Sequence, residues 1–119
     1  MCCKNLRNGI ARYDALQVAW FTTYLTQGDT AIDIGAHNGV YSLLMAAKCG
    51  DTGHVVAFEP DPYAREVLEK NLGLNPEIKR PAVEFCAFSD QIGEATLYTP
   101  GAMVSILARK VWRGVYPRG

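Results

Sequence analysis

The chain lacks several features that mark common classes of protein. Twelve basic and twelve acidic residues cancel across its 119 residues, so no overall charge favours nucleic acid or an anionic membrane as partner. No apolar run approaches the roughly 20 residues that a membrane span requires. The N-terminal stretch MCCKNLRNGIARYD has no apolar segment typical of a secretory signal. We therefore expect a cytoplasmic protein that binds neither membranes nor nucleic acids.

Histidine and cysteine are too sparse to suggest a metal site. The two histidines and four cysteines include no C-x-x-C pair, which argues against zinc. Cys49 falls in a predicted helix and Cys86 in a predicted strand, where a free thiol usually serves as a small buried hydrophobe. We expect reduced cysteines and no bound metal.

The residues that are present are typical of a single soluble α/β domain. Hydrophobic residues make up 49% and charged residues 20% of the chain. Two β-rich runs, Thr30–Ile34 and His54–Phe58, flank a helix that begins near Asn38 or Gly39, and this spacing predicts parallel strands joined by a crossover helix. The first run is so apolar that we expect it to be covered on both faces. Later elements are predicted as a helix starting after Asp61, a strand over residues 81–86 and an edge or antiparallel strand over residues 94–99.

The two ends of the chain carry weaker signals. Residues 1–12 are expected to be loose, and residues 13–27 to form a helix that ends at Gly28. Its apolar face, predicted to pack on the sheet, comprises Leu16, Trp20, Phe21, Tyr24 and Leu25. Residues 101–119 contain arginine and lysine but no acid, and residues 100–119 are predicted as a basic tail without regular structure.

A turn with two glycines, Gly35-Ala36-His37-Asn38-Gly39, separates the first strand from its helix. It is not the dinucleotide fingerprint G-x-G-x-x-G, because His37 stands where the second glycine of that motif belongs. Asp33 would also place a negative charge close to the pyrophosphate of a nicotinamide cofactor. An acid in this place suits a ligand that carries a positive charge.

S-adenosylmethionine is such a ligand, and the pattern fits each of its parts. Asp33 can face its ammonium group, while the N–H groups of residues 36–39 and the helix N-terminus can face its carboxylate. Glu59, just past the second strand, is placed to accept hydrogen bonds from the ribose hydroxyls. Residues 86–90 would border the adenine. The structural alternative is that Asp33 only caps the helix or braces the turn, and we rank it second because the glycines have no simple structural role.

Five segments together resemble the FkbM-type S-adenosylmethionine-dependent methyltransferases: DIGAHNGVYS, VVAFEPDP, LEKNLGLN, AFSD and GEATLY. The resemblance runs from Gly28 to about Tyr98. It implies a Rossmann-like open, mainly parallel sheet and O-methyl transfer to a small-molecule or sugar hydroxyl. The cofactor-binding residues it implies are Asp33, Gly35, Ala36, His37, Asn38, Gly39, Glu59, Pro60 and Ala87, with His37 at a variable position and so a loop residue rather than a base.

The chain also departs from that family. Members continue into a strand that ends in an acidic D-x-E-G-x-E-like segment bordering the acceptor, and this sequence has no counterpart. We therefore expect an incomplete sheet in which residues 13–99 form the cofactor-binding half, with no catalytic base assigned, since Tyr41 and Asp90 suit packing and turn roles better. The alternatives are a catalytically incomplete remnant that binds cofactor weakly or acts through a partner, and, third, a nicotinamide-dependent oxidoreductase. An uncovered sheet edge would permit self-association.

Overall fold

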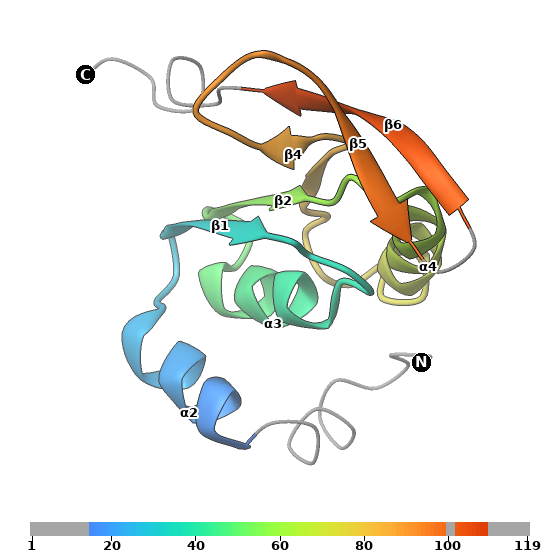
Figure 1. The fold of residues 1–119 in the computed structure, drawn as a ribbon. Coiled ribbons are helices and arrows are strands. Elements are labelled where there is room, and N and C mark those ends of the chain that lie inside the picture. The colour runs from blue at the N-terminus through green and yellow to red at the C-terminus, as the bar shows by residue number, and fades with distance from the viewer. Residues whose placement is uncertain (1–14, 100–101, 110–119) are drawn as a thin grey trace.

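A computed structural model describes residues 15–99 and 102–109 and contains two three-stranded sheets with helices grouped beside one of them (Figure 1). The elements in chain order are α2 (Ala15–Tyr24), β1 (Thr30–Ile34), α3 (Val40–Cys49), β2 (His54–Phe58), α4 (Pro62–Gly73), β3 (Ala82–Glu84), β4 (Ala87–Phe88), β5 (Gly93–Thr99) and β6 (Ala102–Arg109). In the described residues, no helix has the length and apolar character needed to cross a membrane.

The first sheet is parallel throughout and has the order β1-β2-β3. This order is that of one half of a doubly wound sheet, in which each strand is followed by a helix. The predicted bounds of β1 and β2 and their parallel pairing are confirmed. In the register, Asp33 lies opposite Ala57 and Ile34 opposite Phe58, so both strands end at the same edge.

Local signals explain where α3 and α4 begin and end. Gly39 is the residue before α3, and the N–H of Gly50 donates to the carbonyl of Ala46 where the helix stops. The Asp61 carboxylate accepts the N–H of Ala64 at 3.0 Å, and Pro62 is the first residue of α4, as predicted.

The core forms where α3 and α4 meet the parallel sheet. Its first cluster contains Val40, Leu43, Ala57, Leu68 and Leu72, all buried. On α3, Met45 and Ala46 are also buried, in a second cluster, whereas Ala47 is exposed. The buried face of α3 is wider than one stripe because β1, β2, α2 and α4 all contact this helix.

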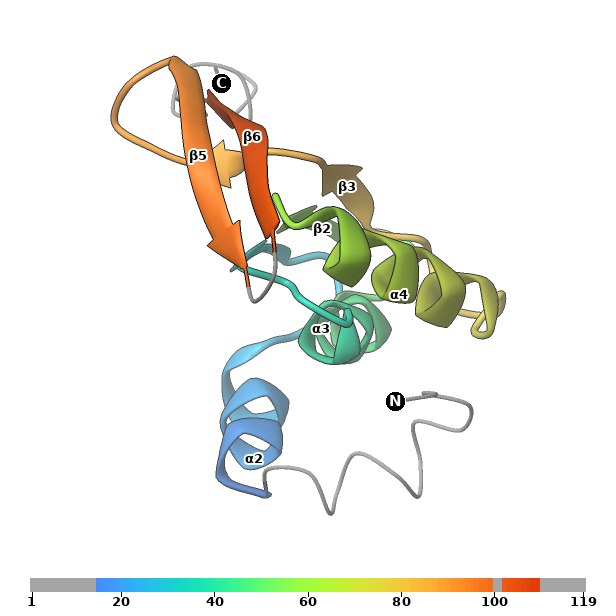
Figure 2. The same cartoon turned by 45° about the vertical axis from the view of Figure 1, so that its right-hand side comes forward.

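The opposite face of the parallel sheet is less covered than predicted. The side chain of Ile34, at the end of β1, is 59% exposed, so the expectation that β1 is covered on both faces is wrong. Crossovers between neighbouring parallel strands that progress in one direction place their helices on the same face. Figure 2 accordingly shows α3 beneath the sheet and the β5–β6 ribbon above it.

Helix α2 packs differently from the prediction, and its described part ends at Tyr24, before Gly28. Trp20 and Tyr24 are exposed and contact each other, with ring centroids 4.8 Å apart. Phe21 packs inward against Tyr41 of α3, with centroids 5.6 Å apart. The predicted apolar face is therefore split, since α2 packs on α3 through Phe21 and leaves the rings of Trp20 and Tyr24 exposed. The predicted helix start and the loose residues 1–12 lie outside the described residues.

The second sheet contains a strand that the sequence reading missed. Its order is β4-β6-β5, with β5 and β6 antiparallel and β4 and β6 parallel. The antiparallel option predicted for residues 94–99 is confirmed, but the prediction of no regular structure from residue 100 is wrong. Strand β6 lacks clean apolar–polar alternation, and the local indication of a hairpin is the turn signal Pro100-Gly101 in the sequence before it.

Candidate functional site

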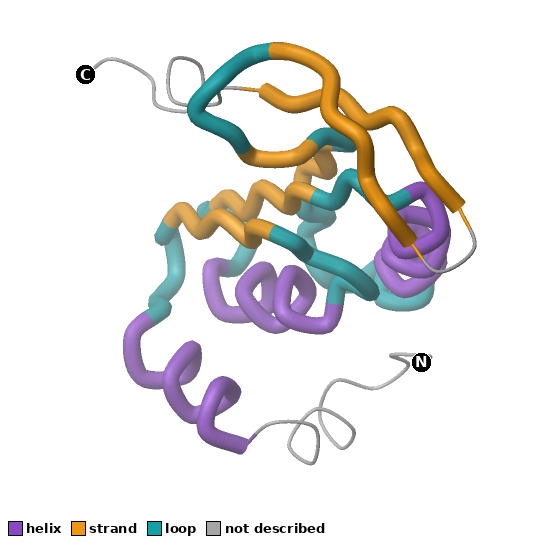
Figure 3. The backbone as a smooth tube through the Cα atoms, in the orientation of Figure 1, coloured by secondary structure: helices purple, strands orange, loops and turns teal. Residues whose placement is uncertain are grey.

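Two carboxylates lie at the carboxyl ends of the neighbouring strands β1 and β2. Asp33 is the penultimate residue of β1, and Glu59 directly follows β2. The loops that leave these strands run at the same end of the sheet, one into α3 and the other into α4 (Figure 3). Ligands of open α/β sheets bind outside this end of the strands. The structure thus brings together the two acids that the sequence analysis selected.

Asp33 is half-buried and is held by α3. The hydroxyl of Ser42, which is completely buried, donates to Oδ2 of Asp33 at 2.5 Å. Burial raises the pKa of Asp33 above its ordinary value, the negative charge of Glu59 adds to this rise, and the hydrogen bond from Ser42 opposes it. A positive charge near Asp33 would favour the ionised form of its carboxyl group and oppose this rise in pKa.

Glu59 is buried and joins the turn after β1 to the start of α4. Its Oε2 accepts the N–H of His37 at 2.8 Å, and its Oε1 accepts the N–H of Asp61 at 2.8 Å. An ionised carboxylate offers about four acceptor positions, so these two bonds leave acceptor capacity for a ligand. Glu59 thus organises the backbone of the site, a role that was not predicted from the sequence.

Most N–H groups of the turn donate inside the protein, which corrects the expectation that residues 36–39 present them to a ligand. The N–H of Ala36 donates to the last carbonyl of β2, that of His37 to Glu59 and that of Gly39 to the carbonyl of Ala36. Within the described part of the chain, the N–H of Asn38 is the one of the four left without a protein acceptor. An anionic group of a ligand would therefore meet Asn38 and the amino end of α3.

The conformation of the turn gives its second glycine a structural role that the sequence analysis did not recognise. Gly39 has a φ of +82°, and a Cβ added to it would lie 3.3 Å from the side chain of Leu68 on α4. His37 also adopts a positive φ, of 51°, a conformation that non-glycine residues rarely adopt. The positive φ and the close approach of Leu68 together disfavour a larger residue at Gly39, whatever the ligand.

The last two residues predicted to contact the cofactor are Pro60 and Ala87, which lie in different parts of the structure. Pro60 is next to Glu59 and is partly buried. Ala87 belongs to β4 of the second sheet. Its neighbour Phe88 packs edge-on against Phe58 at the end of β2, with ring centroids 5.7 Å apart. The second sheet therefore approaches the end of β2 through that pair.

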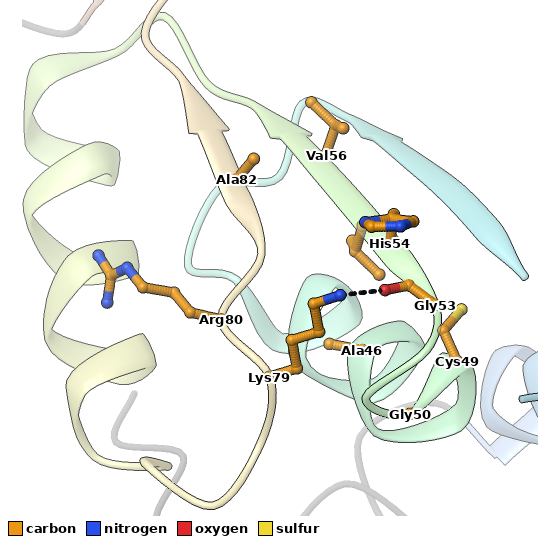
Figure 4. Close-up of a pocket in the computed structure, with 10 residues that line it drawn as sticks. Ala46, Cys49, Gly50, Gly53, His54, Val56, Lys79, Arg80 and Ala82 are labelled. Carbon is orange, nitrogen blue, oxygen red and sulfur yellow. Dashed lines mark hydrogen bonds between the residues drawn. The ribbon is translucent and has the colours of Figure 1, made fainter. Parts of the chain in front are cut away.

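A separate cavity of about 130 Å³ lies at the opposite end of the sheet (Figure 4). It is lined by the first residues of β2 and β3 and by Lys79, whose Nζ donates to the carbonyls of Asp51 at 3.1 Å and Gly53 at 2.8 Å. Cys49 also lines it; burial, and secondarily the charge of Asp29, raise the pKa of this thiol. Lys79 at this cavity thus stabilises the turn after α3, and we assign the cavity a structural role. Nowhere in the described residues do three or more potential metal ligands cluster.

The sequence analysis missed two polar residues that support the site. Ser42 lies on α3 and Asn71 on α4, and both side chains are buried. The available signal was a polar residue on the apolar face of each helix. A buried polar side chain requires a hydrogen-bonding partner, and here both partners belong to the site.

Known proteins are similar to the part of the chain that contains the site. The family model of the methyltransferase FkbM domain matches residues 33–113, so the match continues through β6, beyond Tyr98 where we expected the resemblance to end. Methyltransferase sdnD from Sordaria araneosa is 35% identical over 66 residues, which are 56% of this chain and 25% of sdnD. The chain thus spans about a quarter of the length of this curated relative.

Solved structures show the same fold. Methyltransferase FkbM from Methylobacillus flagellatus KT superposes with a TM-score of 0.57 at 13% identity, over 84% of this chain and 30% of that one. A protein described as an rRNA methylase from Clostridium thermocellum gives a TM-score of 0.57 at 22% identity, over 61% of this chain and 39% of that one. The fold is therefore a Rossmann-like α/β fold, of which the chain covers a part, and the chain belongs to the FkbM methyltransferase domain family.

Proposed function

We propose that the chain binds S-adenosylmethionine at the turn after β1, and that the protein transfers the methyl group to a hydroxyl of a small molecule or sugar. The observation that carries the proposal is the pair of carboxylates, Asp33 and Glu59, on either side of a glycine turn that opens α3. Membership of a methyltransferase family supports the same reading.

The residues present fit the charges of this cofactor. Asp33 would hold the ammonium group, because a cation beside this half-buried carboxyl group would favour its ionised form. Glu59 would accept the ribose hydroxyls with the acceptor positions that its two backbone partners leave open. The N–H of Asn38 and the amino end of α3 would bind the cofactor's carboxylate. Pro60 and Ala87 would border the ribose and the adenine.

When bound, the cofactor would supply a methyl group on a positively charged sulfur: the acceptor oxygen would bond to the methyl carbon as the carbon–sulfur bond breaks, S-adenosylhomocysteine would leave, and the hydroxyl would lose its proton. The chain's contribution is to hold the donor in line with the acceptor, which lowers a barrier by several kcal/mol. A base within hydrogen-bond reach would take the proton. No residue is assigned to that role; Tyr41 packs against Phe21, and Asp90 accepts from Ser89 in an exposed turn.

Calorimetric titration with S-adenosylhomocysteine tests the proposal. We expect the parent chain to bind it, and the double variant Asp33→Ala, Glu59→Ala to lose binding. Asp29→Ala is a matched control, because Asp29 precedes β1 at the far end of the strand and accepts hydrogen bonds from Thr26 there. NADH should not compete for the site. A folded parent chain that fails to bind would overturn the proposal and favour the alternative of an incomplete remnant that acts through a partner.

A further inference from the structure

Helix α4 contacts the turn after β1 through a residue other than the two carboxylates. The side-chain Nδ2 of Asn71 donates to the backbone carbonyl of Asn38 at 2.8 Å. Asn71 is only 2% exposed and lies beside the core residues Leu68 and Leu72 of the same helix. Burial of an amide in an apolar surrounding is unfavourable unless hydrogen bonds compensate it. The contact with the turn provides one such bond.

The turn is anchored from two sides at successive residues. The N–H of His37 donates to Glu59, and the carbonyl of Asn38 accepts from Asn71. The peptide group that Asn71 holds also carries the N–H of Gly39, which closes the turn. Because His37 has a positive φ, this backbone persists only where its surroundings determine it strongly. The two anchors supply that determination.

One helix connects both anchors. At its start, the N–H of Asp61 donates to Glu59, and the Asp61 carboxylate caps α4. Three turns later Asn71 reaches the carbonyl of Asn38, and between these points Leu68 packs beneath Gly39. The position of α4 therefore determines both the position of Glu59 after β2 and the conformation of the turn after β1.

We propose that Asn71 is a positioning residue for cofactor binding. By holding the carbonyl of Asn38, it fixes the conformation of the turn in which the N–H of Asn38 and the amino end of α3 face the cofactor, while Asn71 itself touches no ligand. The inference rests on the proposed function. Loss of this donor should weaken cofactor binding by about tenfold, which corresponds to about 1.4 kcal/mol, the upper end of the range for one net hydrogen bond.

The variant Asn71→Asp tests this role through pH. The substitution keeps the shape of the side chain, but the introduced carboxyl group can donate to the Asn38 carbonyl only when it is protonated. We expect the ratio of variant to parent dissociation constants for S-adenosylhomocysteine to be about tenfold near pH 8 and to fall toward about twofold near pH 5. Asp33, His37 and Glu59 are present in both proteins, so the ratio removes their contribution.

Asn75→Asp is the matched control. Asn75 is also a buried asparagine at the end of α4, but its Nδ2 donates to the carbonyl of Asn71 at 2.9 Å, away from the turn. This variant should lower the thermal stability. Its ratio of variant to parent dissociation constants for S-adenosylhomocysteine should not change with pH. A pH-independent ratio for Asn71→Asp, or equal ratios for both variants, would overturn the inference.

If the Asn71→Asp variant does not fold, a second variant and a second measurement test the same role. The milder Asn71→Ser is too short to reach the carbonyl, and we expect amide hydrogen exchange at Gly39 to be at least about fivefold faster than in the parent and in Asn75→Ser. Unchanged exchange at Gly39 would refute the positioning role. If the parent chain does not bind S-adenosylhomocysteine, the proposed function fails, and the exchange rate still decides whether Asn71 holds the turn.

Discussion

The substitution Asp33→Asn separates a functional from a structural role for this residue. The hydroxyl of Ser42 can donate to the Oδ1 of an asparagine as it does to the carboxylate, so the contact with α3 survives. What disappears is the negative charge. A hydrogen bond to a charged group is worth about 1.5–3 kcal/mol, so we expect S-adenosylhomocysteine to bind roughly 10- to 100-fold more weakly.

The same substitution should leave stability unchanged or raise it. Burial lifts the folded-state pKa of Asp33 above the ordinary aspartate value of 3.8. The folded protein therefore holds this proton more tightly than the unfolded chain, and the ionised group lowers stability as pH rises from 3.8 through the folded-state pKa. At neutral pH the neutral asparagine avoids that loss.

Calorimetric titration and thermal unfolding of the same samples check both expectations. Asp29→Asn serves as the control, because this acid lies at the amino end of β1, where it accepts the N–H of Thr26 at 2.9 Å. It should leave the affinity unchanged. If Asp33→Asn bound as tightly as the parent, the ammonium contact would be refuted. A clear loss of stability would instead make Asp33 a brace of the turn.

Other substitutions test the remaining contacts of the site. Glu59→Gln leaves one buried N–H facing an amide donor, so urea denaturation should show a loss of about 1–3 kcal/mol; an unchanged midpoint would contradict the observed pair of bonds. Gly39→Ala should cost more stability than Gly35→Ala, by about 1 kcal/mol or more, because both have positive φ but only Gly39 is packed against α4. Ser42→Ala removes a hydrogen bond that opposes the rise in the pKa of Asp33, so this pKa should rise further. As the pH is lowered, titrations with S-adenosylhomocysteine should therefore show loss of binding at a higher pH than in the parent.

The central βαβ unit was predictable because its signals are local. The Asp61–Pro62 pair marks the start of α4, Gly50 ends α3, and the apolar runs of β1 and β2 have the right length for strands. The two acids were predictable for a related reason: residues at the ends of neighbouring parallel strands must share one edge of the sheet.

The errors arose where the outcome depended on neighbours distant in sequence. The helical period of α2 was correct, but α2 packs on α3 through Phe21 and leaves Trp20 exposed. Strand β6 exists because β5 pairs with it along seven residue pairs, from Gly93–Ala108 to Thr99–Ala102. Pairing of this kind stabilises a strand whose own sequence carries a weak signal.

The sequence by itself determined where the elements begin, which acids end the strands and which family the glycine turn resembles, because capping, turn and strand propensities act over a few residues. Only the tertiary structure decided which atoms hold the turn. The N–H of His37 reaches Glu59, 22 positions away, and the carbonyl of Asn38 is held by Asn71, 33 positions away. Such bonds form only after β1, β2 and α4 have packed, because burial is what makes an unpaired polar group costly and so selects these partners.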